Sequence, residues 1–92
     1  MRRFGLAAAA YDLTWFDHFD DHAAKLGHWV AQATGQGARL LVFPEYAAME
    51  LSSLGGRDAA ADLEAALHEV ARHGPASDAL HLDLARRHEC LI

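Results

Sequence analysis

Apolar positions in the first half of the chain form two short continuous runs separated by one long periodic segment. Leu40 to Phe43 are all apolar, which is typical of a strand buried on both faces of a sheet. Pro44 predicts the end of that strand's hydrogen-bonded ladder. From Thr14 to Thr34, apolar residues recur every three or four positions and predict an amphipathic helix. Its apolar stripe consists of Phe19, Ala23, Leu26, Val30 and Ala33.

The run from Phe4 to Tyr11 has two interpretations. Its alanines favour a helix on propensity, whereas its short length and continuous apolarity favour a strand packed on both faces. The residues that follow favour the strand, because a strand, a helix, a glycine-rich turn at 35–37 and a buried strand form a βαβ unit. Such a unit predicts a parallel pair of strands joined by a right-handed crossover.

The second half of the chain predicts helices and then the opening of a third strand. Residues 46–57 are typical of a loop, with a helical turn at 47–51 as an option. Helices are expected over 58–72 and from Pro75 to about His88. The residues expected to face inward are Leu63, Ala66, Leu67 and Val70 in the first of these helices and Leu80, Leu84 and Ala85 in the second. Residues 90–92 then resemble the start of a strand, so the predicted fold class is α/β with the order βαβα(α)β.

Composition narrows the class of protein. With 92 residues, a formal charge of −5 and 52% hydrophobic content, the chain allows one domain, and its acidity argues against nucleic-acid binding. The single cysteine, Cys90, excludes an internal disulfide and suits a reducing cytoplasm. The apolar stretch at 4–10 is too short to span a membrane, and acidic residues follow it. We therefore expect a cytoplasmic protein without a membrane partner.

Glu45 is the first candidate for chemistry. It follows Pro44 directly, so we expect it just beyond the carboxyl end of the Leu40–Phe43 strand. Ligands bind at that end of the strands in open α/β sheets. A carboxylate placed there is a candidate general base. The alternative is a solvated loop glutamate, which position alone favours.

The decapeptide Gly37-Ala38-Arg39-Leu40-Leu41-Val42-Phe43-Pro44-Glu45-Tyr46 resembles a segment of the carbon–nitrogen hydrolase (nitrilase) superfamily. The predicted elements also follow that family's order, and residues 85–92 resemble its entry into the third strand, so the resemblance covers almost the whole chain. It implies that residues 1–92 are the N-terminal part of an αββα sandwich domain that is incomplete here. It also implies a small amide or nitrile substrate, no cofactor, no metal and a homo-oligomer.

In that family, hydrolysis depends on a Glu, a Lys and a Cys. The cysteine is the nucleophile, the glutamate is the general base, and the lysine stabilises the developing negative charge. The resemblance places the glutamate at Glu45 and matches no residue to the other two roles. Lys25, the only lysine, lies in the first predicted helix, and Cys90 lies where the family has no catalytic residue. Cys90 is better explained as a small buried strand residue, and the isolated chain is expected to be inactive.

Other polar and aromatic residues have weaker claims to function. His18 and His22 stand four apart on the first helix, as zinc ligands can, but they are expected opposite the apolar stripe and lack a third ligand. A solvated face is the simpler account of this pair. Glu50 is a candidate for a second carboxylate near Glu45, at the carboxyl end of the strand, although no family motif matches it. The histidines expected on the surface are His68, His73, His81 and His88. The aromatic residues expected to have ordinary packing roles are Trp15, Phe16 and Trp29.

Three hypotheses for the whole chain remain open. The first is the N-terminal part of a carbon–nitrogen hydrolase with Glu45 as its base. The second is a truncated or degenerate, non-catalytic α/β module that associates with another chain through its open sheet edge. The third is a zinc-binding helical protein, for which the histidine pair is the only support.

Overall fold

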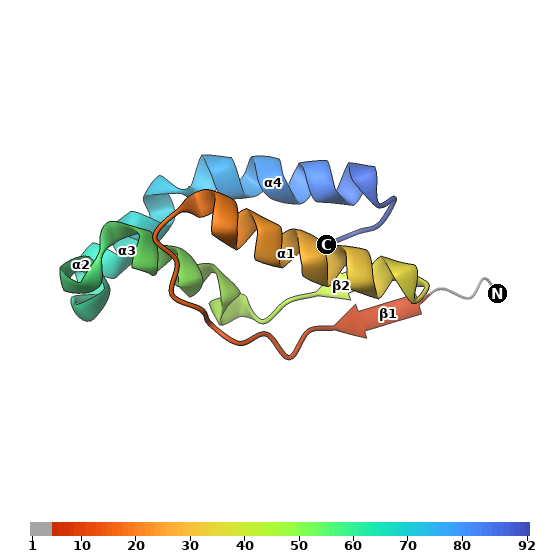
Figure 1. The fold of residues 1–92 in the computed structure, drawn as a ribbon, viewed down its shortest axis with the longest axis horizontal. Helices are drawn as coiled ribbons and strands as arrows, with labels where there is room; N and C mark the ends of the chain where they lie inside the picture. The colour runs from red at the N-terminus through yellow and green to blue at the C-terminus, as the bar shows by residue number, and fades with distance from the viewer. Residues whose placement is uncertain (1–4) are drawn as a thin grey trace.

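The structure is a computed structural model, and it describes residues 5–92. These residues form a small α/β arrangement of two parallel strands, one 3₁₀-helix and four α-helices (Figure 1). In chain order the elements are β1 (Gly5–Ala8), α1 (Phe19–Gly35), β2 (Ala38–Val42), η1 (Glu45–Gly55), α2 (Arg57–Ala61), α3 (Leu63–Arg72) and α4 (Gly74–Arg87). The helix η1 is the 3₁₀-helix.

The predicted parallel pair is confirmed, and β2 is its inner strand. Leu6 of β1 lies opposite Leu40 of β2 in a parallel register. On the other edge of β2, Leu91 also pairs in parallel with Leu40. The Leu41 N–H donates to the Leu91 carbonyl at 2.8 Å, and the Leu91 N–H donates to the Arg39 carbonyl at 2.8 Å. The expected third strand is therefore present as one bridge, and β2 has partners on both edges.

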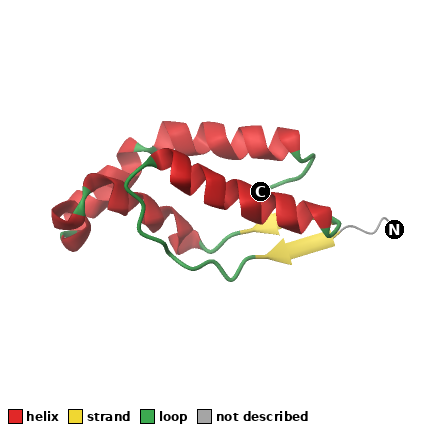
Figure 2. Ribbon diagram, viewed as in Figure 1, coloured by secondary structure: helices red, strands yellow, loops and turns green. Residues whose placement is uncertain are grey.

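The helices α1 and α4 lie on the same side of the two strands (Figure 2). Between them and the sheet, Leu26 and Val30 of α1 pack with Leu41 of β2 and Leu84 of α4. The predicted stripe of the first helix is thus confirmed at Leu26, Val30 and Ala33, as is the inward position of Leu84. Apolar residues of the strands remain exposed, with Leu6 at 63% and Val42 at 49% of their full exposure.

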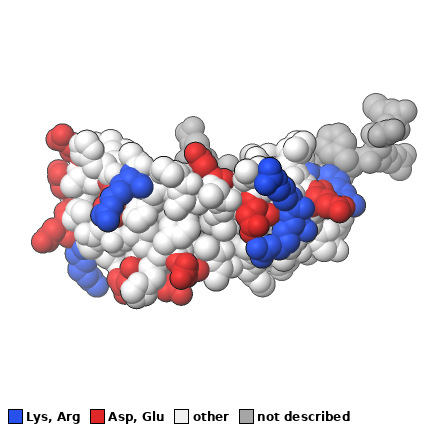
Figure 3. Space-filling model, turned by 90° about the horizontal axis from the view of Figure 1, so that it is seen from above, with Lys and Arg blue, Asp and Glu red and all other residues white. Residues whose placement is uncertain are grey.

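The remaining surface of the helical layer carries both charged and apolar side chains, and Leu82 of α4 is 52% exposed. Acidic and basic side chains are interspersed on the face drawn in Figure 3. Some of these charges pair within a helix, as Arg87 does with Asp83 at 2.6 Å. Over residues 5–92, no helix combines the length and the apolar content that crossing a membrane requires.

The first helix begins at Phe19, later than the predicted Thr14, because the preceding backbone bonds to side chains instead. The Thr14 N–H donates to the Glu50 carboxylate at 2.9 Å, and the Phe16 N–H donates to the Ser53 hydroxyl at 3.0 Å. Because both acceptors belong to η1, these bonds hold residues 9–18 against η1 as an irregular connection. The predicted strand from Phe4 to Tyr11 is likewise shortened to β1, and Phe4 lies outside the described residues.

The second half differs from the prediction in two places. Residues expected as a loop form η1, and the helix expected over 58–72 is divided at Asp62. Asp62 adopts an extended conformation and accepts a hydrogen bond from the Ala65 N–H at 3.1 Å, so it is the N-cap of α3. The helix α3 contacts η1, and its buried residue is Ala66, as predicted. The predicted inward positions of Leu63 and Leu67 are wrong, because both side chains are exposed. The helix predicted from Pro75 is confirmed as α4, with Pro75 in its first turn.

The close approach of β1 to the start of β2 requires glycine at position 5. A Cβ atom at Gly5 would lie 2.5 Å from the Gly37 carbonyl oxygen and 2.9 Å from the Ala38 Cα, both backbone atoms. We expect Gly5→Ala to lower the free energy of unfolding by about 1–3 kcal/mol, because the strands must move apart. Gly35→Ala is the matched control, since nothing lies within 4 Å of its Cβ position. Equal urea midpoints for the two variants would contradict this account of the strand pair.

Candidate functional site

The most completely bonded side chain in the described residues is the carboxylate of Glu50, in η1. Its side chain is fully buried, with 0% exposure. One oxygen, Oε1, accepts hydrogen bonds from the Tyr11 hydroxyl at 2.6 Å and from Nδ1 of His22 at 2.7 Å. The other, Oε2, accepts from Nζ of Lys25 at 2.5 Å and from the Thr14 N–H at 2.9 Å. We call Glu50 with these four partners the Glu50 cluster.

The ammonium of Lys25 is also fully occupied. Besides Glu50, it donates to the Thr14 hydroxyl at 2.9 Å and to the Asp12 carbonyl. These bonds use all three of its protons. Its Nζ atom also lies 4.0 Å from the centre of the Tyr11 ring, as a cation–π contact. Lys25 therefore joins α1 to the connection between β1 and α1.

Three separate segments supply the Glu50 cluster. Tyr11 and Thr14 come from the connection after β1, His22 and Lys25 stand three residues apart on one face of α1, and Glu50 comes from η1. The prediction that His22 lies on the solvated face is wrong, since its side chain is only 6% exposed. Its spacing to Leu26 explains why, because residues four apart on a helix share a face. The 22, 26, 30 spacing in the sequence could have shown that His22 extends the buried stripe.

The charges in the cluster are set by burial and hydrogen bonding. Burial raises the pKa of Glu50, but the hydrogen bonds from Lys25, Tyr11, His22 and Thr14 outweigh it and hold the pKa below the usual range. Burial raises the pKa of Tyr11, and its bond to the Glu50 carboxylate raises it further. Glu50 is thus an ionised carboxylate, and both of its oxygens are occupied by donors. That arrangement suits a group that fixes structure, and it leaves no free oxygen to take a proton from a substrate.

Glu45 begins η1, immediately after Pro44 and beyond the carboxyl end of β2. Its backbone position agrees with the sequence prediction, while its side chain lies outside what the structure describes. The neighbouring Tyr46 hydroxyl donates to the Tyr11 carbonyl at 3.4 Å. The segment that carries Glu45 therefore contacts the connection after β1, close to the Glu50 cluster. The role of Glu45 as a base stays a prediction.

Cys90 lies toward the opposite end of the strands. It is buried and directly precedes Leu91, whose N–H bonds to the Arg39 carbonyl. From Arg39 to Phe43 the extended chain covers about 13 Å, at roughly 3.3 Å per residue, and Glu45 lies beyond that. Burial raises the pKa of the Cys90 thiol, although the Arg39 charge opposes the shift. The structure therefore agrees with Cys90 as a small buried residue.

The other histidine prediction concerns zinc. His18 is exposed, whereas His22 is buried against Glu50, so the two imidazoles do not share a solvated face. Among residues 5–92, no three or more His, Cys, Asp and Glu side chains are grouped so that they could hold a metal ion. The structure thus gives the hypothesis of a zinc-binding helical protein no support.

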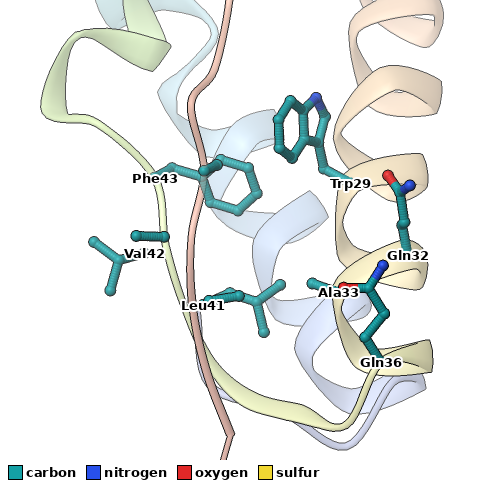
Figure 4. Close-up of a pocket in the computed structure, with 10 residues that line it drawn as sticks. Trp29, Gln32, Ala33, Gln36, Leu41, Val42 and Phe43 are labelled. Atoms are coloured by element: carbon teal, nitrogen blue, oxygen red, sulfur yellow. The ribbon is translucent and has the colours of Figure 1, made fainter.

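A cavity of about 280 Å³ lies between α1 and the strands (Figure 4). Trp29 and Gln32 of α1 and Gln36, the residue after α1, project toward it, while Leu41 of β2 and Phe43, just after β2, line the other side. The two glutamine amides can donate and accept hydrogen bonds, and the other walls are mostly apolar. No charged side chain lines this cavity. Trp29 also contacts Phe43, with ring centres 6.5 Å apart, which agrees with its predicted packing role.

Comparisons with known proteins give no family for the chain. No family model matches it, and no curated protein or solved structure matches it.

The Glu50 cluster predicts a large loss of stability when its charge is removed. We expect Glu50→Gln to lower the free energy of unfolding by roughly 3 kcal/mol at neutral pH, because Lys25 then loses its buried counter-charge and an amide cannot accept four bonds. The measurement is urea unfolding followed by circular dichroism. Glu64→Gln is the matched control, since the Glu64 side chain is 86% exposed and its contact with His68 is 3.8 Å long.

The pH dependence of the same pair of proteins tests the cause. Because folding lowers the pKa of Glu50, its stabilisation is complete above its usual pKa of 4.5 and is lost as the pH falls through the lower folded-state pKa. The difference between the original chain and Glu50→Gln should therefore shrink below about pH 4.5. A difference that stays constant down to pH 3, or a Glu64→Gln effect of the same size, would contradict an ionised Glu50.

Proposed function

We propose that this chain supplies the general base, Glu45, of a hydrolase that acts on non-peptide carbon–nitrogen bonds of a small amide or nitrile. The observation that carries the proposal is the position of Glu45. It follows Pro44 at the carboxyl end of β2, the strand with partners on both edges. Ligands of open α/β sheets bind at that end. The resemblance of residues 37–46 to the nitrilase superfamily supports assigning this carboxylate the role of base.

The reaction needs two groups besides Glu45. A cysteine thiol gives its proton to the glutamate and attacks the amide or nitrile carbon, and a lysine stabilises the negative charge that develops on the tetrahedral intermediate. In an amide, ammonia or an amine leaves with that proton, and the glutamate then activates water to release the acid from the thioester. Lys25 is committed to Glu50, and Cys90 is buried near the other end of β2. Both partner residues are therefore proposed to come from polypeptide other than residues 1–92.

The complete domain is proposed to be a four-layer αββα sandwich that pairs into a dimer. In that arrangement a second sheet covers the face on which Leu6 and Val42 are exposed. The Glu50 cluster would have a positioning role, since Glu50 and Glu45 belong to the same 3₁₀-helix. Its bonds to the connection after β1 and to α1 would fix where η1 begins, and hence where Glu45 stands.

The test combines the chain with a polypeptide from the same genome that supplies the lysine and the cysteine. The two are either fused in one reading frame or co-expressed as separate chains. We expect hydrolysis of small amides or nitriles by the combined protein and no hydrolysis by residues 1–92 alone. Glu45→Gln in the combined protein should lower kcat by about 10²–10⁴-fold, because an amide cannot take the thiol proton. The measurement is release of ammonia under saturating substrate.

Glu64→Gln is the control for this experiment, since its exposed side chain lies on α3, away from β2. Its kcat should equal that of the unaltered protein. Turnover by residues 1–92 alone, or unchanged kcat in Glu45→Gln, would refute the proposal.

A second candidate function is a non-catalytic module that acts by association. The exposed apolar side chains of the strands and of the segment paired with β2 favour it, because such patches mark interaction sites. They are Leu6, Val42 and Leu91. This function predicts that the chain binds itself or a partner and that Glu45→Gln does not change this binding. The hydrolase predicts instead that Glu45→Gln abolishes most of the activity, so the same variant separates the two candidates.

A further inference from the structure

A second cavity, of about 150 Å³, lies between α1, η1 and α4 at the carboxyl end of β2. Its walls are mainly apolar and include Leu26, Phe43 and Leu51. Its polar lining residues are His22, His81, Ser77 and Tyr11, and the Tyr11 hydroxyl already donates to Glu50. The cavity is thus mainly apolar with a few polar groups, which is the usual composition of a site for a small molecule.

The His22 ring has one occupied and one unoccupied nitrogen. Its Nδ1 lies 2.7 Å from Oε1 of Glu50, and because an ionised carboxylate can only accept, Nδ1 carries the proton of that bond. Its Nε2 is buried and has no hydrogen-bond partner among the described residues. In the neutral ring, Nε2 is therefore an acceptor that needs a donor. A buried acceptor without a donor is costly, so this atom points to a ligand.

The His81 ring is held in the same way from α4. Its Nδ1 lies 2.7 Å from the Ser77 carbonyl oxygen, which can only accept, so Nδ1 again carries the proton. The Nε2 atom of the neutral ring is again an acceptor. Both rings of the cavity are thus fixed in orientation by a bond on the Nδ1 side, and neither offers a donor from its other nitrogen.

We propose that this cavity binds a small neutral molecule with an apolar body and a single N–H or O–H group, which donates to Nε2 of His22. The apolar walls disfavour a charged ligand, because burying an unpaired charge is expensive. The two imidazole acceptors select a donor. A cavity of about 150 Å³ in a protein core accepts a molecule of the size of benzene, so a ring of five or six atoms fits.

The place of the cavity gives its ligand a structural consequence. Pro44 and Ala47 belong to its wall and flank Glu45 in the chain. A bound molecule would therefore contact the backbone segment that carries Glu45. Binding to Nε2 of His22 does not require Glu45 to act as a base, so this proposal and the proposed hydrolase can fail separately.

The test compares the affinities with which the 92-residue chain binds two small ring molecules of equal size. Pyrrole carries one N–H donor, whereas furan has an oxygen in its place and no donor. We expect pyrrole to bind roughly three- to tenfold more tightly than furan, the ratio that one net hydrogen bond gives. Long-range nitrogen–proton NMR should show the Nε2 resonance of His22 shifting with pyrrole and not with furan. Equal affinities, or no binding of either ring, would overturn the proposal. So would zinc shifting that resonance while pyrrole does not, because the site would then be a metal site.

A pair of variants locates the binding. Ala47→Leu places three more carbon atoms into the cavity and should weaken pyrrole at least tenfold, while leaving every bond of the Glu50 cluster intact. Ala31→Leu, on the exposed side of α1, is the control and should bind as the unaltered chain does. Unchanged binding by Ala47→Leu would overturn the assignment to this cavity. If that variant does not fold, the comparison of pyrrole with furan on the unaltered chain still decides.

Discussion

The structure depends on one buried carboxylate being fully bonded. Placing the Glu50 charge away from water costs several kcal/mol, and this cost is offset only when its hydrogen-bond partners are present together. The partners come from the connection after β1 and from α1, while Glu50 itself belongs to η1. The same four bonds therefore hold three segments together at the carboxyl end of β2. The apolar core between the helices and the sheet is small, which makes this polar contact a large share of what fixes that end.

The sequence predicted the elements that local patterns control. The βαβ unit, the end of β2 before Pro44 and the helix with Pro75 in its first turn all follow from periodicity and from the conformational limits of proline and glycine. It failed where distant residues decide the local structure. The helix expected from Thr14 starts later because its backbone bonds to Glu50 and Ser53, which lie 36 and 37 residues away. The division at Asp62 is a different case, since an aspartate N-cap is a local signal that the continuous helical pattern concealed.

The site was predicted only in outline. Glu45 could be placed because it follows a recognisable strand, and Glu50 was noticed only as a second carboxylate nearby. The partners of Glu50 are 25 to 39 residues away in the chain, and no local pattern connects them. The prediction placed His22 on the solvated face of α1, whereas its spacing of four residues to Leu26 indicates the buried face on which it lies. Polar residues within an apolar stripe therefore carry information about buried networks that hydrophobic patterns alone do not.

The commitment of Lys25 to the Glu50 cluster has a chemical consequence. This residue is the only lysine of the chain, and its side chain is 18% exposed, with three acceptors around its nitrogen. An amine must lose a proton and leave its partners before it can react with an acylating reagent. The rate of side-chain acylation at this one position therefore reports how often the carboxyl end of β2 opens, without any probe being introduced. A local opening equilibrium can thus be followed by mass spectrometry on the natural sequence.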